Sequence, residues 1–431
     1  MSGLLTTVEH GSVQAGGGWL RWPLAALYSL GFFSITAVAQ VSLKLGVPSR
    51  DLTIGTRGVI LACALISIAG AVFHRRQILS PVPLALILAF WVFYTARLLQ
   101  ATMADTSLLQ LPSQEYWLFA YGTCLFPFMA FSVTIRPQDH RLVWRAFLAG
   151  LIVTMTLIAV TNTDYLSQGQ GRLGDVSGSI SPIEIAYMGS LSVSLALYWL
   201  LWRRDGGRGR LLGPIVLLAL GVIALLLGAG RGSVLAILAC AALTVAPRFS
   251  RRKTRAAGLA LGAICLFGVL SWAAERTDSP LFRRIAELAD VREEDSSYFR
   301  AVLWNNAINQ FHQSPLTGSG LEEEEYHSYP HNLVIEALMA TGIAGGACFT
   351  IAALLAVRRS YHLIAIEHSH AWIGMVFVNY LVFGMFSSAI YNSFQYWSAL
   401  AAVFAVPLRV AAASPAAWRP HLREVRGTDS R

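Results

Sequence analysis

The chain has 431 residues, of which 55% are hydrophobic and only 13% are charged. A soluble domain carries about 25% charged residues, so this composition excludes an ordinary soluble enzyme. Apolar runs of about 20 residues recur along the chain, and each is long enough to cross a bilayer. Because a helix satisfies its own backbone in lipid, we predict an all-α polytopic membrane protein.

The apolar runs predict about twelve transmembrane helices within one integral-membrane domain over residues 1–431. The expected spans cover residues 20–42, 53–73, 79–97, 115–135, 143–161, 182–202, 211–230, 232–247, 257–274, 332–357, 371–389 and 392–411. The longest polar segment is a loop at 275–331, between the ninth and tenth spans. The first 18 residues have no basic segment, so no cleaved signal peptide is predicted.

The distribution of lysine and arginine predicts the orientation. With both termini cytoplasmic, the inner loops contain "HRRQ", "RRDGGRGR" and "RFSRRKTR". These loops and tails then hold about two thirds of the basic residues, as the positive-inside rule requires. The net charge of +9 is therefore interpreted as topology and contact with anionic membrane lipids, and no nucleic-acid binding is predicted.

The cysteines and the outer loops predict neither disulfides nor a metal site. All five cysteines lie in apolar runs, where they are interpreted as small buried hydrophobic residues: Cys63, Cys124, Cys240, Cys265 and Cys348. None has the spacing of metal ligands. The predicted outer face offers no clear metal-ligand set either, so no cofactor is expected.

Two outward segments before residue 240 carry an arginine each. "QGRLGDVSGSISPIEIAYMGS" places Arg172 in a glycine-rich loop, which is a weak signal by itself. "LLLGAGRGSVLAIL" places Arg231 in a tight Gly-Arg-Gly link between two apolar runs. An arginine at such depth is costly unless it meets an anion, although a snorkelling arginine at a hairpin tip explains it equally well.

Residues 296–321 read "SSYFRAVLWNNAINQFHQSPLTGSGL". Arg300, Trp304, Ala307 and Phe311 recur at spacings of four, three and four, which predicts one face of an amphipathic helix lying on the outer surface. Proline and glycine then end the helix. Arg300 is interpreted either as a solvated surface residue or as a cation directed into the protein. The acidic run Glu322–Glu325 follows, read as a solvated cluster or as a cation or sugar-hydroxyl site.

The segment "YPHNLVIEAL" stands where the long polar loop gives way to the tenth span. Pro330 restricts Tyr329 to an extended conformation and so marks a boundary. We expect His331 and Asn332 in the first turn of the following helix. A histidine there is often a structural residue, but a neutral imidazole can also accept a proton at physiological pH.

These segments together resemble the O-antigen ligase and polymerase superfamily of bacterial membrane glycosyltransferases. The matching pieces are "GAGRGSVLAIL", the stretch from Arg300 to Leu321 and "YPHNLVIEALMATGIAGG". The loop with Arg172 looks like an outer loop of the family, but it has "SP" where many members have Pro-Asn. The resemblance implies a helical architecture of the GT-C type, no nucleotide sugar and no required metal.

Members of this superfamily take a glycan from an undecaprenyl-diphosphate carrier on the periplasmic face of the inner membrane. Ligases transfer it to the lipid A core, in lipopolysaccharide biosynthesis, and polymerases transfer it to another carrier-linked unit. Arg231 and Arg300 suit a diphosphate, because a guanidinium binds phosphate oxygens bidentately. His331 suits a general base. The expected substrate-binding residues are Arg172, Trp304, Tyr329 and Asn332.

Three functions follow from these residues. The first is an inverting, metal-independent O-antigen ligase that acts on a carrier-linked glycan and a lipid A core acceptor. A polymerase of O-antigen or exopolysaccharide units shares the same chemistry, so the motifs do not separate the two. A transporter is disfavoured, because the sequence has no internal repeat and its notable polar residues gather at one face rather than at mid-membrane.

Overall fold

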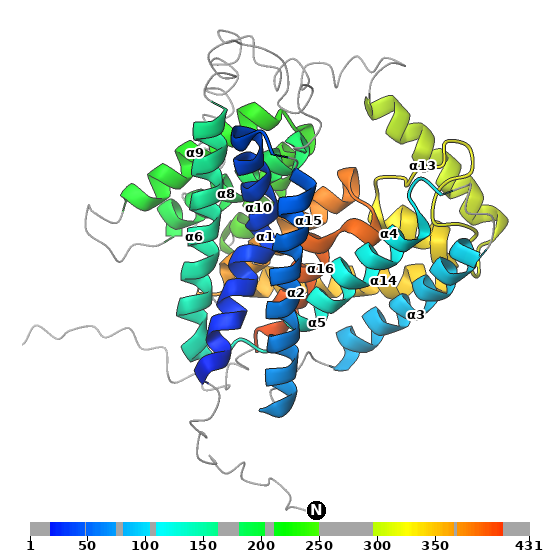
Figure 1. Cartoon of the computed structure of the whole chain (residues 1–431), viewed down its shortest axis with the longest axis horizontal. Coiled ribbons are helices and arrows are strands. Elements are labelled where there is room, and N and C mark those ends of the chain that lie inside the picture. The colour runs from blue at the N-terminus through cyan, green and yellow to red at the C-terminus, as the bar shows by residue number, and fades with distance from the viewer. Residues whose placement is uncertain are drawn as a thin grey trace, which may run out of the picture.

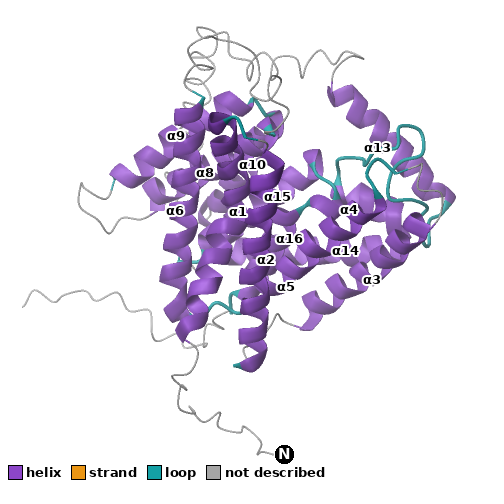
Figure 2. Cartoon of the chain, viewed as in Figure 1, coloured by secondary structure: helices purple, strands orange, loops and turns teal. Residues whose placement is uncertain are grey.

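The computed structural model describes residues 18–47, 49–74, 81–103, 109–162, 181–202, 211–249, 296–365 and 369–407. In this part of the chain, all regular structure is helical, and a single β-bridge joins Glu323 to Ser328 (Figures 1 and 2). The predicted all-α class is therefore confirmed. The ninth expected span, the loop that carries Arg172 and residues 275–295 lie outside the described residues.

Nine of the described helices have the apolar character of membrane spans. Six are long enough to cross a bilayer by length and composition, and they lie in Gly18–Leu45, Leu52–Phe73, Pro81–Met103, Pro137–Thr161, Pro182–Leu200 and Leu333–Ala365. Three are shorter: Leu212–Gly228, Arg231–Ala246 and Ala371–Ser387. The chain is thus a multi-pass membrane protein.

The helix bounds follow the predicted spans closely for most elements. The helices are α1 (Arg21–Leu45), α2 (Ser49–Phe73), α3 (Pro81–Met103), α6 (Pro137–Thr161), α8 (Pro182–Trp202), α9 (Leu212–Gly228), α10 (Arg231–Phe249), α13 (Ser296–Gln313), α14 (Leu333–Ala365) and α15 (Ala371–Ser387). Of these, α13 is the predicted helix of the outer loop, and it packs on α14.

Two expected spans are not single helices. The run at 115–135 consists of α4 (Ser113–Trp117), a π-helix (η3, Leu118–Leu125) and α5 (Phe126–Phe131). Pro127 has no N–H to donate to the carbonyl four residues earlier, which favours a wider turn just before it. The last expected span begins with a 3₁₀ turn (η6, Ile390–Asn392), and α16 (Phe394–Ala405) follows.

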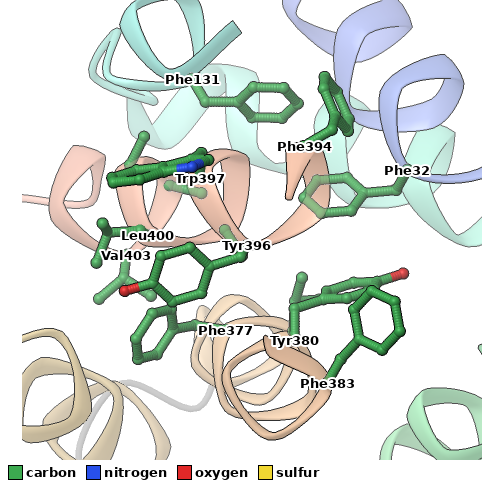
Figure 3. Packing of buried hydrophobic residues seen from close by; sticks show 14 of the residues in the cluster. Phe32, Phe131, Phe377, Tyr380, Phe383, Phe394, Tyr396, Trp397, Leu400 and Val403 are labelled. Atoms are coloured by element: carbon green, nitrogen blue, oxygen red, sulfur yellow. The ribbon is translucent and has the colours of Figure 1, made fainter. Parts of the chain in front are cut away.

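Aromatic side chains fill the centre of the molecule around α16. Trp397 and Tyr396 are fully buried there. Figure 3 shows Phe131, Phe394 and Phe32 on one side of α16, and Phe377, Tyr380 and Phe383 on the α15 side. Such large rings bury much apolar area each and fix the distance between helices.

Small residues let α8 and α9 touch near the start of α8 and the end of α9. An added Cβ at Gly189 would lie 2.8 Å from the carbonyl oxygen of Gly221, and one at Gly228 would lie 2.6 Å from the backbone nitrogen of Ala186. Small residues at helix contacts allow this close backbone approach. The contact also brings the start of α10, three residues after Gly228, beside the first turns of α8.

The segment "SPLTGSG" docks on a bend in α14. Gly342 has a φ of 63° inside that helix, and Gly318 in the segment has a φ of 72°. The backbones interlock, because Ile343 N donates to Pro315 O at 2.8 Å and Ser319 N donates to Met339 O at 2.9 Å. This docking fixes where the 321–332 loop starts, and His331 lies near the end of that loop.

Candidate functional site

Arg231 is the first residue of α10 and stands at the predicted tight link. Helix α9 ends at Gly228, and Ala229 has a left-handed φ of 44°. The half-buried Arg231 donates from Nη1 to Ser297 Oγ at 3.0 Å. Because Ser297 lies in the first turn of α13, this bond ties the hairpin tip to the helix of the outer loop.

Arg300 lies one turn further along α13 and is half-buried. The helix is anchored next to it by Trp304, whose Nε1 donates to Pro330 O at 2.7 Å. The most buried positions of α13 are Leu303, Ala307 and Gln310. The buried face of α13 is therefore rotated slightly from the predicted one. Arg300 lies at the edge of this face and not at its centre.

The charge of Arg300 acts on three side chains from other segments. His331 and Tyr329 belong to the end of the outer loop, and Tyr187 belongs to the second turn of α8. The rings of Tyr329 and His331 lie edge to face, with centroids 4.4 Å apart. The start of α10, the start of α13, the end of the loop and α8 therefore meet at one place.

His331 and Asn332 lie before α14 and not in its first turn, which corrects the prediction. The helix begins at Leu333, and Asn332 caps it: Oδ1 accepts hydrogen bonds from Val334 N at 3.1 Å and Ile335 N at 3.2 Å. His331 has a left-handed φ of 55°. Asparagine is among the best capping residues, so the cap sets the helix start one residue after it.

The surroundings of His331 keep its ring neutral. Burial, together with the charge of Arg300, lowers the pKa of His331 to about 4. Its Nδ1 is buried and has no hydrogen-bond partner among the described residues. A neutral imidazole retains a lone pair that can accept a proton. The ring is thus in the protonation state that a general base requires at physiological pH.

An aromatic series leads from the histidine to the acidic run. Tyr329 lies 6.1 Å from Tyr391, and Tyr391 lies 4.7 Å from Tyr116, measured between ring centroids. The hydroxyl of Tyr116 donates to Glu322 Oε1, and Gln110 N donates to Glu322 Oε2 at 2.9 Å. Burial raises the pKa of the Glu322 carboxyl above its usual range.

The acidic run is only partly solvated, which corrects one of its two interpretations. Glu322 and Glu323 are buried, whereas Glu324 and Glu325 are exposed. Glu323 accepts hydrogen bonds from the backbone nitrogens of Glu325 and Tyr326, at 3.1 and 2.6 Å. These two carboxylates therefore fold the loop from inside, as structural acceptors.

A cavity of about 400 Å³ opens beside the buried carboxylates. Its lining includes Gln100, Gln310, Glu322, Glu324 and His327. Among the described residues, no group of three or more histidine, cysteine, aspartate or glutamate side chains is placed to hold a metal ion. The cavity is lined by groups that donate and accept hydrogen bonds, at the same end of α14 as His331.

The structure brings six of the seven predicted site residues to one region: His331, Arg231, Arg300, Asn332, Trp304 and Tyr329. Arg172 lies outside the described residues. Sequence reasoning missed Tyr187, because one tyrosine in an apolar span carries no signal of its own. Its position is evident only when Gly232 and Arg300 are placed beside it.

Comparison with protein families finds a similarity over the region that holds the candidate site. Residues 214–350 match a family model described as O-antigen ligase. This region of the chain is therefore similar to the O-antigen ligase family. The match runs from α9 into α14 and includes Arg231, Arg300 and His331. A search of curated proteins and a search of solved structures each found no match.

The similarity to the O-antigen ligase family agrees with the membrane fold and with the resemblance of the three motifs. The matched stretch contains the hairpin, the outer-loop helix and the His-Asn segment in one continuous region. The match does not distinguish a ligase from a polymerase.

Proposed function

We propose that the protein is an O-antigen ligase, which transfers a glycan from undecaprenyl diphosphate to the lipid A core oligosaccharide. The observation that carries the proposal is the convergence of Arg231, Arg300 and His331 from three separate segments. A carrier-linked transfer needs stabilisation of the departing diphosphate and removal of a proton from the acceptor hydroxyl. The three side chains supply these two chemical functions.

The two arginines are the residues for the diphosphate. A guanidinium stays charged and presents a planar set of donors to phosphate oxygens. Two such groups stabilise the charge that develops as the bond between the anomeric carbon and the phosphate oxygen breaks. The diphosphate leaves with that electron pair on one side of the sugar.

His331 is the residue for the acceptor. The neutral ring accepts the hydroxyl proton while the acceptor oxygen attacks the anomeric carbon from the face opposite the diphosphate, so the configuration inverts. A pKa of about 4 makes the free histidine a weak base. A bound diphosphate would offset the charge of Arg300, which would raise the pKa of the ring toward its ordinary value.

The distribution of basic residues supports a location in the bacterial inner membrane with both termini in the cytoplasm. This orientation puts the starts of α8, α10 and α14 at the periplasmic side, where a carrier-linked glycan presents its head group. The lipid tail of the carrier then lies among the helices. The mechanism uses neither a metal ion nor a nucleotide sugar.

The test is reconstitution with defined substrates. The purified protein is incubated with a carrier-linked glycan and with lipid A core, separately and together, and the products are identified by mass spectrometry. A ligase forms glycosylated lipid A core only when both are present. A polymerase forms longer carrier-linked chains without the core, and a transporter forms no product.

Single variants test the residues. Arg231→Ala, Arg300→Ala and His331→Asn should each lower kcat at least about 100-fold, which is the lower end of what a charge-stabilising donor or a general base contributes. Two exposed residues serve as controls: Arg141 at the start of α6 and His312 at the end of α13. Arg141→Ala and His312→Ala should keep full activity, and full activity of His331→Asn would remove the base from the mechanism.

A further inference from the structure

Tyr187 on α8 and the N-terminus of α10 form a second set of donors beside the two arginines. We propose that the Tyr187 hydroxyl, with the first backbone N–H groups of α10, donates hydrogen bonds to the diphosphate of the carrier. This inference rests on the proposed function and adds a substrate-binding residue to it. No covalent step is assigned to the tyrosine.

The Tyr187 hydroxyl is buried without a partner. The residue is 1% exposed, and its oxygen has no hydrogen-bond partner among the described residues. Burying a hydroxyl without a partner is unfavourable, so a protein gains stability by replacing it with a phenyl ring unless the hydroxyl has another use. A ligand that brings an acceptor would supply the missing partner.

The hydroxyl is directed at the start of α10. A methyl group added at Gly232, the second residue of that helix, would overlap the Tyr187 oxygen. The first N–H groups of an α-helix have no acceptor within the helix, and the helix dipole favours an anion there. Helix α10 has 19 residues and no acidic residue in its first turn to occupy this position. The absence of a side chain at Gly232 keeps the approach open.

The two cations of the site are close to the same point. Arg231 is the neighbour of Gly232 in the first turn of α10, and the charge of Arg300 acts on Tyr187. A diphosphate has several oxygens, so it can accept from guanidinium, hydroxyl and backbone donors together. The arrangement is thus suited to an anion larger than a carboxylate.

The position of Tyr187 does not depend on its hydroxyl. Its backbone carbonyl accepts from Asn379 Nδ2 at 3.1 Å and from Ser190 Oγ at 2.8 Å. Its ring packs on Phe383 with centroids 4.8 Å apart. A phenylalanine at this position should therefore keep the ring where it is and remove the oxygen alone.

Other buried tyrosines provide the comparison. The hydroxyls of Tyr28, Tyr380 and Tyr396 also have no partner among the described residues, so an unpaired hydroxyl by itself does not define a site. Tyr187 differs because Gly232 and Arg300 are its neighbours. Tyr28 is equally buried and packs on Phe131 and Trp372 instead, which makes Tyr28→Phe a matched control.

The experiment compares Tyr187→Phe with Tyr28→Phe in purified protein reconstituted in lipid nanodiscs. We expect Tyr187→Phe to lower kcat/KM for the carrier-linked donor about 10- to 100-fold, because it removes a hydrogen bond to a charged group. The KM of the acceptor should stay unchanged. The melting temperature should stay unchanged or rise. Tyr28→Phe should behave as wild type.

A second measurement separates binding from chemistry. Undecaprenyl diphosphate, the product of transfer, inhibits by occupying the donor site, and its inhibition constant should rise in Tyr187→Phe and stay unchanged in Tyr28→Phe. An unchanged inhibition constant, or a kcat/KM within twofold of wild type, would overturn the role of Tyr187. If Arg231→Ala and Arg300→Ala also keep full activity, the proposed function itself fails. If they lose activity while Tyr187→Phe keeps it, only the tyrosine assignment fails.

Discussion

His331 combines a displaced pKa with an unusual backbone. Its ring is half-buried, edge to face with Tyr329 and within the field of Arg300. The identity of this residue could be predicted from the sequence, because a histidine at the boundary of a polar loop and an apolar span is conspicuous. Its left-handed φ and its place before the helix could not be predicted, since they depend on how Asn332 satisfies the first N–H groups of α14.

The lowered pKa of His331 predicts the pH dependence of transfer. A depressed pKa favours the neutral form, so the base is active above the pKa and is lost as the pH falls through it. The value of kcat/KM for the donor, which reports the free enzyme, should therefore fall on the acid side with a midpoint near pH 4. The midpoint of kcat should lie higher, because a bound diphosphate offsets the charge of Arg300.

The effect of Arg300 on the pKa of His331 can be tested directly. In Arg300→Gln, the pKa of His331 should rise only part of the way from about 4 toward about 6.5, because burial still lowers it. NMR of labelled histidine measures this shift, and His331→Asn assigns the signal. A wild-type midpoint of kcat/KM at about 6.5, with no shift in Arg300→Gln, would contradict the electrostatic account.

Two replacements of Asn332 should affect stability and donor binding differently. Asn332→Ala removes the cap of α14 and should lower the free energy of unfolding by about 0.5–2 kcal/mol. Asn332→Asp keeps an oxygen acceptor and should retain that stability, while its negative charge beside the site should raise the KM of the anionic donor. Thermal unfolding and donor kinetics of both variants check this, and an unchanged donor KM in Asn332→Asp would place the diphosphate elsewhere.

At the scale of elements, the "SPLTGSG" segment and the bend of α14 act as one joint. Arg97 on α3 holds this joint: its guanidinium donates to the carbonyl oxygens of Thr317, Gly318, Ser319 and Ala340. The sequence predicts the end of α13 from proline and glycine, but not this partner, because Arg97 is more than 200 residues away in the chain. The burial of Glu322 likewise depends on partners more than 200 residues away, Tyr116 and Gln110.

Glycine at the joint predicts a large loss of stability on substitution. Gly342→Ala places a Cβ at a φ of 63° and against the backbone of Leu316, so it should destabilise the protein by more than about 2 kcal/mol. Gly213 at the start of α9 has nothing within 4 Å of an added Cβ. Gly213→Ala should therefore be neutral or slightly stabilising. Equal melting temperatures for the two variants would show that the bend is not constrained.

Replacing Arg97 should lower both the stability of the protein and its activity, although Arg97 does not belong to the candidate site. Arg97→Met should lower the free energy of unfolding by about 1–3 kcal/mol, since it leaves buried carbonyl oxygens without donors. It should also lower kcat, because the segment positions the loop that ends at His331. Arg97→Lys restores the charge but not the planar set of donors, so it should rescue only part of either effect. An unchanged kcat in Arg97→Met would show that the joint does not position the residues of the site.

Taken as a whole, the molecule gathers its candidate site at one set of helix ends. The starts of α8, α10 and α14 meet there, and the opposite ends carry other clusters, such as His140 with His370 and Trp372. Composition alone predicts most spans, because apolar length is a local property. Successive spans cross the membrane in alternating directions, so the sequence also predicts that the starts of α8, α10 and α14 lie on the same side. The side-chain contacts between these helices are known only from the packed structure.

The orientation predicts which surface residues are accessible from outside the cell membrane. A cysteine introduced as His312→Cys should react with a membrane-impermeant maleimide applied from the periplasmic side. Arg141→Cys should react only after the membrane is permeabilised. Both positions are exposed, so the difference isolates the side of the membrane. Labelling of Arg141→Cys in intact spheroplasts would reverse the proposed topology.

The left-handed backbone at residue 331 also limits what evolution can place there. Only glycine, asparagine, aspartate and histidine adopt this conformation at low cost, so most replacements penalise folding as well as chemistry. A descendant that lost transfer while remaining well folded would most readily carry glycine or asparagine at this position. The residue after Pro330 is therefore the position at which the sequence of such an inactive chain would differ.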